Sequence, residues 1–163
     1  MDNQIKRTTL MVRDAERSAQ WYQTVFGMTR WFDKPFTLSG VGLAAGQAGD
    51  ETRLVILKCS DPVIGMLGLL EWVNPKMEAP KEIPTRVTFG MPIFVVTSDD
   101  AHGVYERAKA EGTHIHAEPH DWEVVGANDE IKTMRSVSVF DPDGYFYEVN
   151  ETLSVKPAGD VTG

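Results

Sequence analysis

Alternating apolar and polar positions open the chain and predict a strand over residues 5–12. The alternation gives two faces, one with Leu10 and Val12 and the other with Arg7, Thr9 and Met11. Asp14 follows as a predicted helix N-cap. Apolar residues at helical spacing then run over residues 15–26 and stop at Gly27. The pattern therefore predicts a strand, a tight turn and an amphipathic helix.

The same pattern returns in the second half of the chain. Residues 92–96 predict a strand, Asp99 or Asp100 predicts an N-cap, and an apolar stripe predicts a second helix from Ala101. Such self-similarity indicates an internal repeat.

Aligning the valines of the two predicted strands sets the register of this repeat. Val12 and Val96 lie 84 residues apart (96 − 12), and this offset places Met91 opposite Arg7. The two residues would then start equivalent strands.

Short apolar runs separated by turn residues follow each helix. They predict strands at 29–36, 41–45 and 53–58 in the first half, and at 113–117, 122–125, 132–140 and 146–150 in the second. Asp141–Gly144 has the composition of a tight turn.

These elements predict an α+β fold made of two tandem βαβββ modules. We expect the sheets to form a concave half-barrel with the helices on its convex side. The expected divisions are a first module at 1–60, a proline-rich linker with an apolar segment at 61–87, a second module at 88–153, and a flexible tail at 154–163.

Composition narrows the class of protein. The chain has 163 residues, 42% of them hydrophobic, and a formal net charge of −8, which favours a globular protein and argues against a nucleic-acid partner. No apolar run approaches the ~20 residues of a membrane span, so no membrane partner is expected. Residues 1–4 do not begin a secretory signal and Cys59 is the one cysteine, so we expect a cytoplasmic protein.

Two segments of the sequence carry a resemblance to a known superfamily. Residues 5–14 read IKRTTLMVRD and lead to Trp21-Tyr22 and to Phe26-Gly27-Met28, while residues 140–148 read FDPDGYFYE. The first segment resembles the opening module of the vicinal oxygen chelate superfamily, which includes glyoxalase I, bleomycin-resistance proteins and extradiol dioxygenases. The second is similar to its closing hairpin, and closest to the glyoxalase branch. The resemblance implies the two-module fold, but the same scaffold hosts lyases, isomerases, dioxygenases and non-catalytic binders.

The resemblance also implies where metal-using members place their ligands. Glu148 matches the carboxylate of the closing hairpin, whereas Arg7 stands where the superfamily has His or Gln and Met91 where it has His. Residues 55–57 (Val-Ile-Leu) stand where glyoxalases supply a Glu. A guanidinium cannot donate a lone pair and a thioether suits copper(I). We therefore expect no resident metal or other cofactor, with a divalent metal bound through Glu148 as the alternative.

The histidines leave a second possibility for a metal. His114 and His116 are spaced so that both imidazoles fall on one strand face. This spacing is typical either of a metal-binding pair or of a surface strand with two ordinary histidines.

Arg7 and Glu148 are the candidate catalytic residues. We expect Arg7 to reach Glu148 in place of the missing metal, so that Glu148 moves a proton while Arg7 stabilises an oxyanion. A solvated Glu148 without a catalytic role is the alternative. Alternation and position add the expected ligand-binding residues, which are Thr9, Met11, Met91, Ile93, Phe146, Trp122 and His120.

Three functional hypotheses follow. The first is a metal-free protein that binds a small, largely apolar or aromatic molecule, as bleomycin-resistance proteins do. The second is a metal-independent lyase or isomerase that uses Glu148. The third, a metal enzyme with recruited histidines, requires ligand positions that the resemblance does not supply. The apolar segment 63–70 within the predicted linker also favours a homodimer, because a partner would cover it.

The lost ligand positions predict weak metal binding. After dialysis of the wild-type protein against Zn, Ni, Mn or Fe(II), we expect no near-stoichiometric metal by elemental analysis. Arg7→His should not create tight binding, because Met91 and residues 55–57 still offer no suitable donor. Near-stoichiometric metal that disappears in Glu148→Ala would show the prediction to be wrong.

Overall fold

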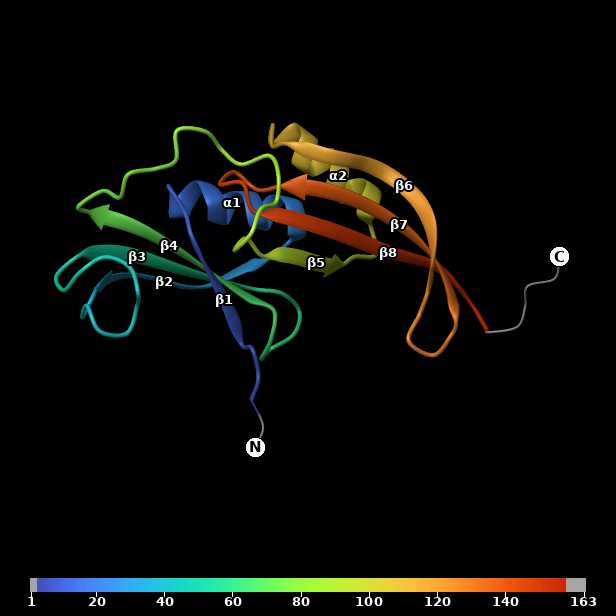
Figure 1. Ribbon diagram of the computed structural model, residues 1–163, viewed down its shortest axis with the longest axis horizontal. Coiled ribbons are helices and arrows are strands. Elements are labelled where there is room, and N and C mark those ends of the chain that lie inside the picture. The colour runs from blue at the N-terminus through green and yellow to red at the C-terminus, as the bar shows by residue number, and fades with distance from the viewer. Residues whose placement is uncertain (1–2, 158–163) are drawn as a thin grey trace. The chain divides into compact units, whose positions relative to one another are not determined.

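The computed structural model describes residues 3–157, and the chain divides into two compact units, 1–83 and 84–163. Each unit has the element order β-α-β-β-β (Figure 1). The first contains β1 (Arg7–Met11), α1 (Ala15–Phe26), β2 (Thr29–Thr37), β3 (Glu51–Lys58) and β4 (Met66–Asn74). The second contains β5 (Ile93–Thr97), α2 (Ala101–Ala110), β6 (Ile115–Val125), β7 (Ile131–Phe140) and β8 (Phe146–Lys156). The predicted α+β class with two tandem βαβββ modules is confirmed.

Both units have the same sheet topology. The strand orders are β1-β4-β3-β2 and β5-β8-β7-β6. In each sheet the first strand pairs in parallel with the last, and the other neighbours are antiparallel. The chain must therefore pass through the helix and two further strands before the first strand gains its partner.

The first helix forms and ends as its sequence predicts. The Asp14 carboxylate accepts hydrogen bonds of 3.0 Å from the backbone N–H groups of Glu16 and Arg17. Gly27 ends the helix at a φ of 67°, a left-handed conformation in which glycine carries no steric penalty. The buried face of α1 includes Trp21 and Tyr22, whose rings meet edge to face with centroids 5.0 Å apart.

The predicted linker at 61–87 is wrong in its central part, because residues 66–74 form β4. Met66–Leu70 is buried, and β4 lies between β1 and β3. A strand buried on both faces shows a continuous apolar run and no alternation, which is why the pattern and the flanking prolines suggested a linker. The expected homodimer loses most of its support here, although Val63 and Ile64 remain about half exposed; it stays a prediction.

Other boundaries also differ from the sequence-based expectations. Residues 41–45 form bends instead of a strand, in a glycine-rich loop between β2 and β3. The two strands expected at 113–117 and 122–125 are one strand, β6, interrupted by bulges near His116 and Pro119. β8 extends to Lys156, so the expected tail at 154–163 begins as sheet; residues 158–163 lie outside the described part of the chain.

In each unit, a carboxylate on the strand that comes last in the chain accepts a hydrogen bond from the first backbone N–H group of the helix. The Glu71 Oε2 atom accepts from the Ala15 amide at 3.0 Å, and the Glu151 Oε2 atom accepts from the Ala101 amide at 3.2 Å. These amides belong to the first turn, where no intrahelical acceptor exists and negative charge is favoured. This repeated contact does not follow from the sequence pattern, because it joins residues about 50 positions apart.

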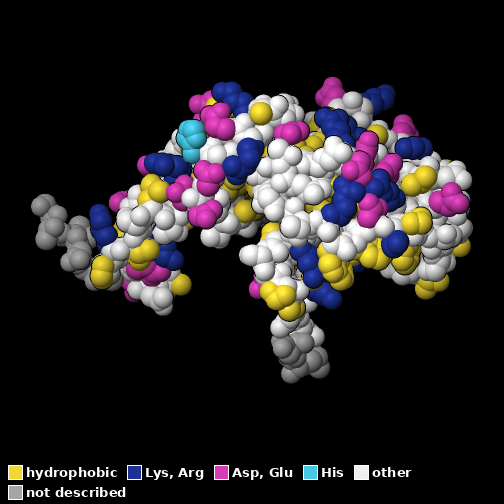
Figure 2. Space-filling model, turned by 180° about the vertical axis from the view of Figure 1, so that it is seen from behind, with side chains coloured by type: hydrophobic (Ala, Val, Ile, Leu, Met, Phe, Trp, Pro, Cys, Tyr) yellow, Lys and Arg dark blue, Asp and Glu magenta, His cyan; other side chains and the backbone are white. Residues whose placement is uncertain are grey.

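On the face shown in Figure 2, Lys and Arg side chains lie beside Asp and Glu side chains and form no continuous basic patch. Among residues 3–157, no helix is long and apolar enough to cross a membrane.

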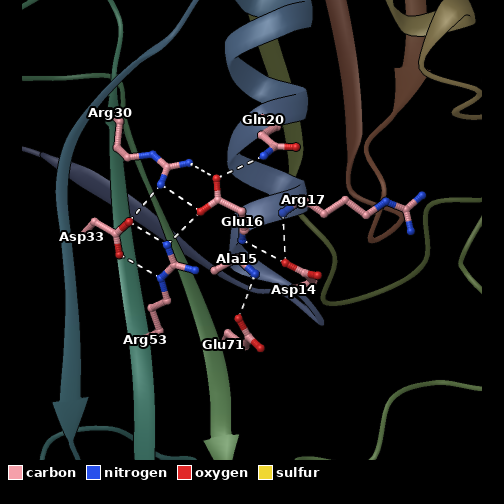
Figure 3. Close-up of polar contacts among 9 residues, drawn as sticks. All are labelled: Asp14, Ala15, Glu16, Arg17, Gln20, Arg30, Asp33, Arg53 and Glu71. Carbon is pink, nitrogen blue, oxygen red and sulfur yellow. Dashed lines mark hydrogen bonds and ion pairs between the residues drawn. The ribbon is translucent and has the colours of Figure 1, made fainter.

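Four of these charged residues connect α1 to β2 and β3 (Figure 3). Glu16 of α1 accepts from Arg30 at 2.8 Å and from Arg53 at 2.8 Å. Asp33 of β2 accepts from the same two arginines at 2.9 and 2.7 Å. The hydrogen bonds from Arg30, and next from Arg53, lower the pKa of Glu16 from 4.5 to about 2.

This charge cluster predicts a pH dependence of stability. The folded-state pKa of Glu16 lies below its ordinary value. The ionised Glu16 side chain therefore adds to the free energy of unfolding above pH 4.5, and this stabilisation is lost as the pH falls towards 2. Because 42% of the Glu16 side chain is exposed, we expect Glu16→Gln to cost only about 1 kcal/mol at pH 7. Urea denaturation at pH 7, 4 and 3 should show a shallower pH dependence in Glu16→Gln than in wild type. The control is Glu123→Gln on β6, an exposed carboxylate whose loss should leave the slope unchanged; equal slopes in all three proteins would contradict the prediction.

Candidate ligand-binding site

One face of the second sheet points away from α2 and brings several predicted residues together. Val137, Val139, Tyr147 and Val149 are buried on the helix side. The alternate positions of β7 and β8 therefore point the other way. We call this side the open face; it contains Ile93, Val95, His120, Trp122, Ser136, Ser138, Phe146, Glu148 and Asn150.

A chain of hydrogen bonds crosses the open face from β6 to β8. The Trp122 Nε1–H group donates to Ser136 Oγ at 2.6 Å. The Ser136 hydroxyl donates to Asn150 Oδ1, and Asn150 Nδ2 donates to Glu148 Oε1 at 2.9 Å. Ser136 is only 3% exposed, so water does not reach its hydroxyl, and Trp122 and Asn150 provide the hydrogen-bond partners that a buried hydroxyl needs. We call these four residues the relay.

The hydrogen bonds of the relay all donate in the same direction, from Trp122 towards Glu148. An indole N–H can only donate, so the Ser136 hydroxyl uses its lone pair for Trp122 and its single hydrogen for Asn150. The amide of Asn150 must then present its oxygen to Ser136 and its NH₂ group to Glu148. Glu148 therefore receives the last hydrogen bond as an acceptor. Its second oxygen, Oε2, forms no hydrogen bond with any described residue of the second unit.

Glu148 has polar neighbours on one side and apolar neighbours on the other: Ser138 lies opposite it on β7 and Asn150 is hydrogen-bonded to it, whereas Val95 and Phe146 are apolar. Val95, its parallel partner on β5, is 67% exposed, and Ile93 is 58% exposed. Phe146 packs against Phe140 with ring centroids 5.2 Å apart and against His116 at 6.0 Å. A single carboxylate thus lies beside two exposed aliphatic side chains and one partly buried aromatic ring.

The structure places the predicted residues of the second unit as follows. Glu148 and Trp122 belong to one relay, and Phe146 and Ile93 lie beside them. His120 lies opposite Ser136 in the β6–β7 register, with its Nδ1 atom 3.0 Å from the Glu118 carbonyl oxygen. Met91 precedes β5 in a turn, where its Sδ atom accepts from the Thr88 hydroxyl at 3.4 Å.

The predicted residues of the first unit also share one face. Leu10 and Val12 are buried towards α1, so Arg7, Thr9 and Met11 point away from it. A Cβ atom at Gly68 of β4 would lie 2.8 Å from Thr9 Oγ1 and 3.3 Å from Arg7 Cδ. The stem of Arg7 thus occupies the space above Gly68. The expected pairing of Arg7 with Glu148 stays a prediction.

The structural repeat corrects the sequence alignment. The N-caps Asp14 and Asp100 lie 86 residues apart, and the equivalent carboxylates Glu71 and Glu151 lie 80 apart. By these offsets the counterpart of Arg7 is Ile93, and the counterpart of Glu148 is Gly68. Aligning Val12 with Val96 led to Met91, whereas the structural offset of 86 places Ser98 opposite Val12. Residues 55–57 stood in the place of Gly68 because β4 was assigned to the linker.

The corrected positions do not fit a resident divalent metal. Of Arg7, Gly68, Ile93 and Glu148, only Glu148 has a donor atom for one, whereas such sites use three or more. No group of three or more His, Cys, Asp or Glu residues within 3–157 is placed to hold a metal ion. His114 and His116 lie against aromatic rings, with centroids 5.4 Å from Phe140 and 6.0 Å from Phe146.

Sequence reasoning missed Ser136 and Asn150. Ser136 stands in the run Ser-Val-Ser-Val-Phe, where each hydroxyl alternates with a buried apolar residue. A serine at such a position indicates a hydrogen bond across the sheet, because a buried hydroxyl needs a partner. The identity of that partner required the β7–β8 register, in which Ser136 lies opposite Asn150.

Comparisons with known proteins are consistent with this geometry. A family model described as the Glyoxalase/Bleomycin resistance protein/Dioxygenase superfamily matches residues 4–149. No curated protein matches the sequence significantly.

Solved structures share the fold at low sequence identity. A glyoxalase family protein from Bacillus cereus has a TM-score of 0.70 and 14% identity over 93% of this chain and 97% of its own. TioX from Micromonospora sp. ML1 has a TM-score of 0.53 and 17% identity over 93% of this chain and 100% of its own. The fosfomycin resistance protein FosX from Listeria monocytogenes, complexed with Mn(II) and sulfate, has a TM-score of 0.52 and 14% identity over 93% of each chain. At these identities the likeness concerns the fold alone.

The relay predicts that Ser136 matters more than its neighbour Ser138. Ser136→Ala leaves Trp122 Nε1–H and Asn150 Oδ1 without their partner, and we expect a loss of about 1–3 kcal/mol in the free energy of unfolding. Ser138→Ala is the control, because Ser138 is also buried on the same strand and face but its hydroxyl forms no hydrogen bond with a described residue. Urea denaturation followed by far-UV circular dichroism measures both. Equal losses in the two variants would contradict the role of the relay.

Proposed function

Because the chain belongs to the glyoxalase/bleomycin resistance protein/dioxygenase superfamily, we propose that it binds a small, largely apolar or aromatic molecule on the open face, without a metal. The observation that carries this proposal is the pairing of the relay with exposed aliphatic groups beside Glu148. Ligand sites combine apolar side chains with a few oriented polar groups, and the open face combines Ile93, Val95 and Phe146 with the polar chain of the relay.

The apolar part of the open face supplies the binding free energy in this proposal. Ile93 and Val95 are more than half exposed, and covering such side chains removes apolar surface from water. The relay supplies orientation, since it presents one carboxylate oxygen in a fixed position. The poor donor set supports the metal-free form of the proposal.

A second candidate function is a metal-independent lyase or isomerase. It is favoured by the direction of the relay, which leaves Glu148 as an acceptor whose Oε2 atom is available to take a proton from a substrate. In this candidate function Glu148 is the general base. Turnover of a bound molecule that is lost in Glu148→Gln would favour this candidate over simple binding.

Two valines provide a matched test of the binding surface. Val95 and Val125 are 67% and 66% exposed, but Val95 lies beside Glu148 while Val125 is on the opposite face, three positions beyond Trp122. We expect Val95→Asn to weaken binding of the neutral probe phenethyl alcohol about tenfold, because apolar contact is lost. Val125→Asn should leave binding within twofold.

The measurement is a titration followed by NMR with EDTA present, using the full chain. A protein that binds the probe only after addition of a divalent metal would contradict the metal-free proposal. Equal effects of the two valine substitutions would contradict the placement of the ligand on the open face. Identification of a co-purified molecule by native mass spectrometry would then give the natural ligand class.

A further inference from the structure

The polar group that a ligand presents to the open face is constrained by the one free oxygen of Glu148. The relay occupies Oε1 with an N–H donor and cannot reverse, because its first member is an indole. A carboxylate oxygen in this state accepts hydrogen bonds and repels other acceptors. A ligand group that meets Oε2 must therefore donate.

The open face favours a charged donor over a neutral one. Glu148 is its single carboxylate, and no Lys, Arg or His among the described residues of the second unit forms an ion pair with it. Glu148 is partly buried, and its near neighbours Val95 and Phe146 have no charge to offer it. A cationic N–H group would supply both the missing hydrogen bond and the missing charge, and such bonds are about twice as strong as neutral ones.

We infer, on the basis of the proposed function, that the ligand is an apolar or aromatic amine whose protonated nitrogen donates to Glu148 Oε2. Its hydrocarbon part covers Ile93 and Val95, and its nitrogen completes the row of hydrogen bonds that begins at Trp122. The net charge of −8 also favours the approach of a cation over that of an anion.

Three probes with the same phenethyl body test this inference. Phenethylamine, phenethyl alcohol and 3-phenylpropanoate carry a cation, a neutral donor and an anion in turn. We expect the amine to bind at least about tenfold more tightly than the alcohol in NMR titrations of the full chain at pH 7.5, and the carboxylate to bind most weakly.

Glu148→Gln is the sharpest variant, since it keeps an amide oxygen for Asn150 and replaces Oε2 by an NH₂ group. It should weaken amine binding about tenfold or more and leave alcohol binding within twofold. Glu123→Gln removes the same charge from the opposite face of β6 and should change neither affinity.

The outcomes separate this inference from the proposed function. Alcohol binding that is sensitive to Val95→Asn, with no preference for the amine, overturns the inference and leaves the proposed function standing. Tightest binding of 3-phenylpropanoate, lost in Arg7→Gln, also overturns it and assigns the polar contact to Arg7. Absence of binding by all three probes up to about 10 mM overturns both the inference and the proposed function, since that range covers the affinity expected for a fragment of this size.

Discussion

The parallel pairing of the first and last strands determines which residues of each unit can act together. β1 pairs with β4 and β5 with β8, so Thr9 lies beside Gly68 and Val95 beside Glu148. The same pairing brings Glu71 and Glu151 to the first N–H groups of their helices. Helix placement, core and candidate site all depend on this non-local contact, which joins strands separated in sequence by a helix and two further strands.

The hydrogen-bond donors and acceptors of the open face are ordered, with a donor, Trp122, at one end of the relay and an acceptor, Glu148, at the other. Trp122 and Glu148 are 26 residues apart in sequence but belong to one relay, because β6, β7 and β8 are neighbours. Charge has a different role in the first unit, where Glu16, Arg30, Asp33 and Arg53 satisfy one another and hold α1 against β2 and β3. The relay leaves the Glu148 Oε2 atom available as an acceptor, whereas in the charge cluster each charged side chain is paired with one of opposite sign.

The sequence was most informative where structure is local. The capped helices, the turn at Asp141–Gly144 and the faces of β1 follow from patterns a few residues long, and all are present. β4 was missed because a strand buried on both sides has no alternation to detect. Glu148, Trp122 and Phe146 were recognised as site candidates, but Ser136 and Asn150 were not, because their significance lies in a contact between strands. The metal positions were misassigned for a related reason: the register of a repeat is fixed by strand pairing, and similar valines cannot determine it.

Gly68 makes the last strands of the two units differ in the side chain that they can hold at equivalent positions. Its counterpart, Glu148, is the polar centre of the open face, whereas a Cβ atom at Gly68 would collide with Thr9 Oγ1 and press on the stem of Arg7. A carboxylate side chain at position 68 would therefore require the side chains of Thr9 and Arg7 to move. The two units, which share one topology, therefore differ in the side chains that this position of the last strand accommodates: none in the first unit and a carboxylate in the second.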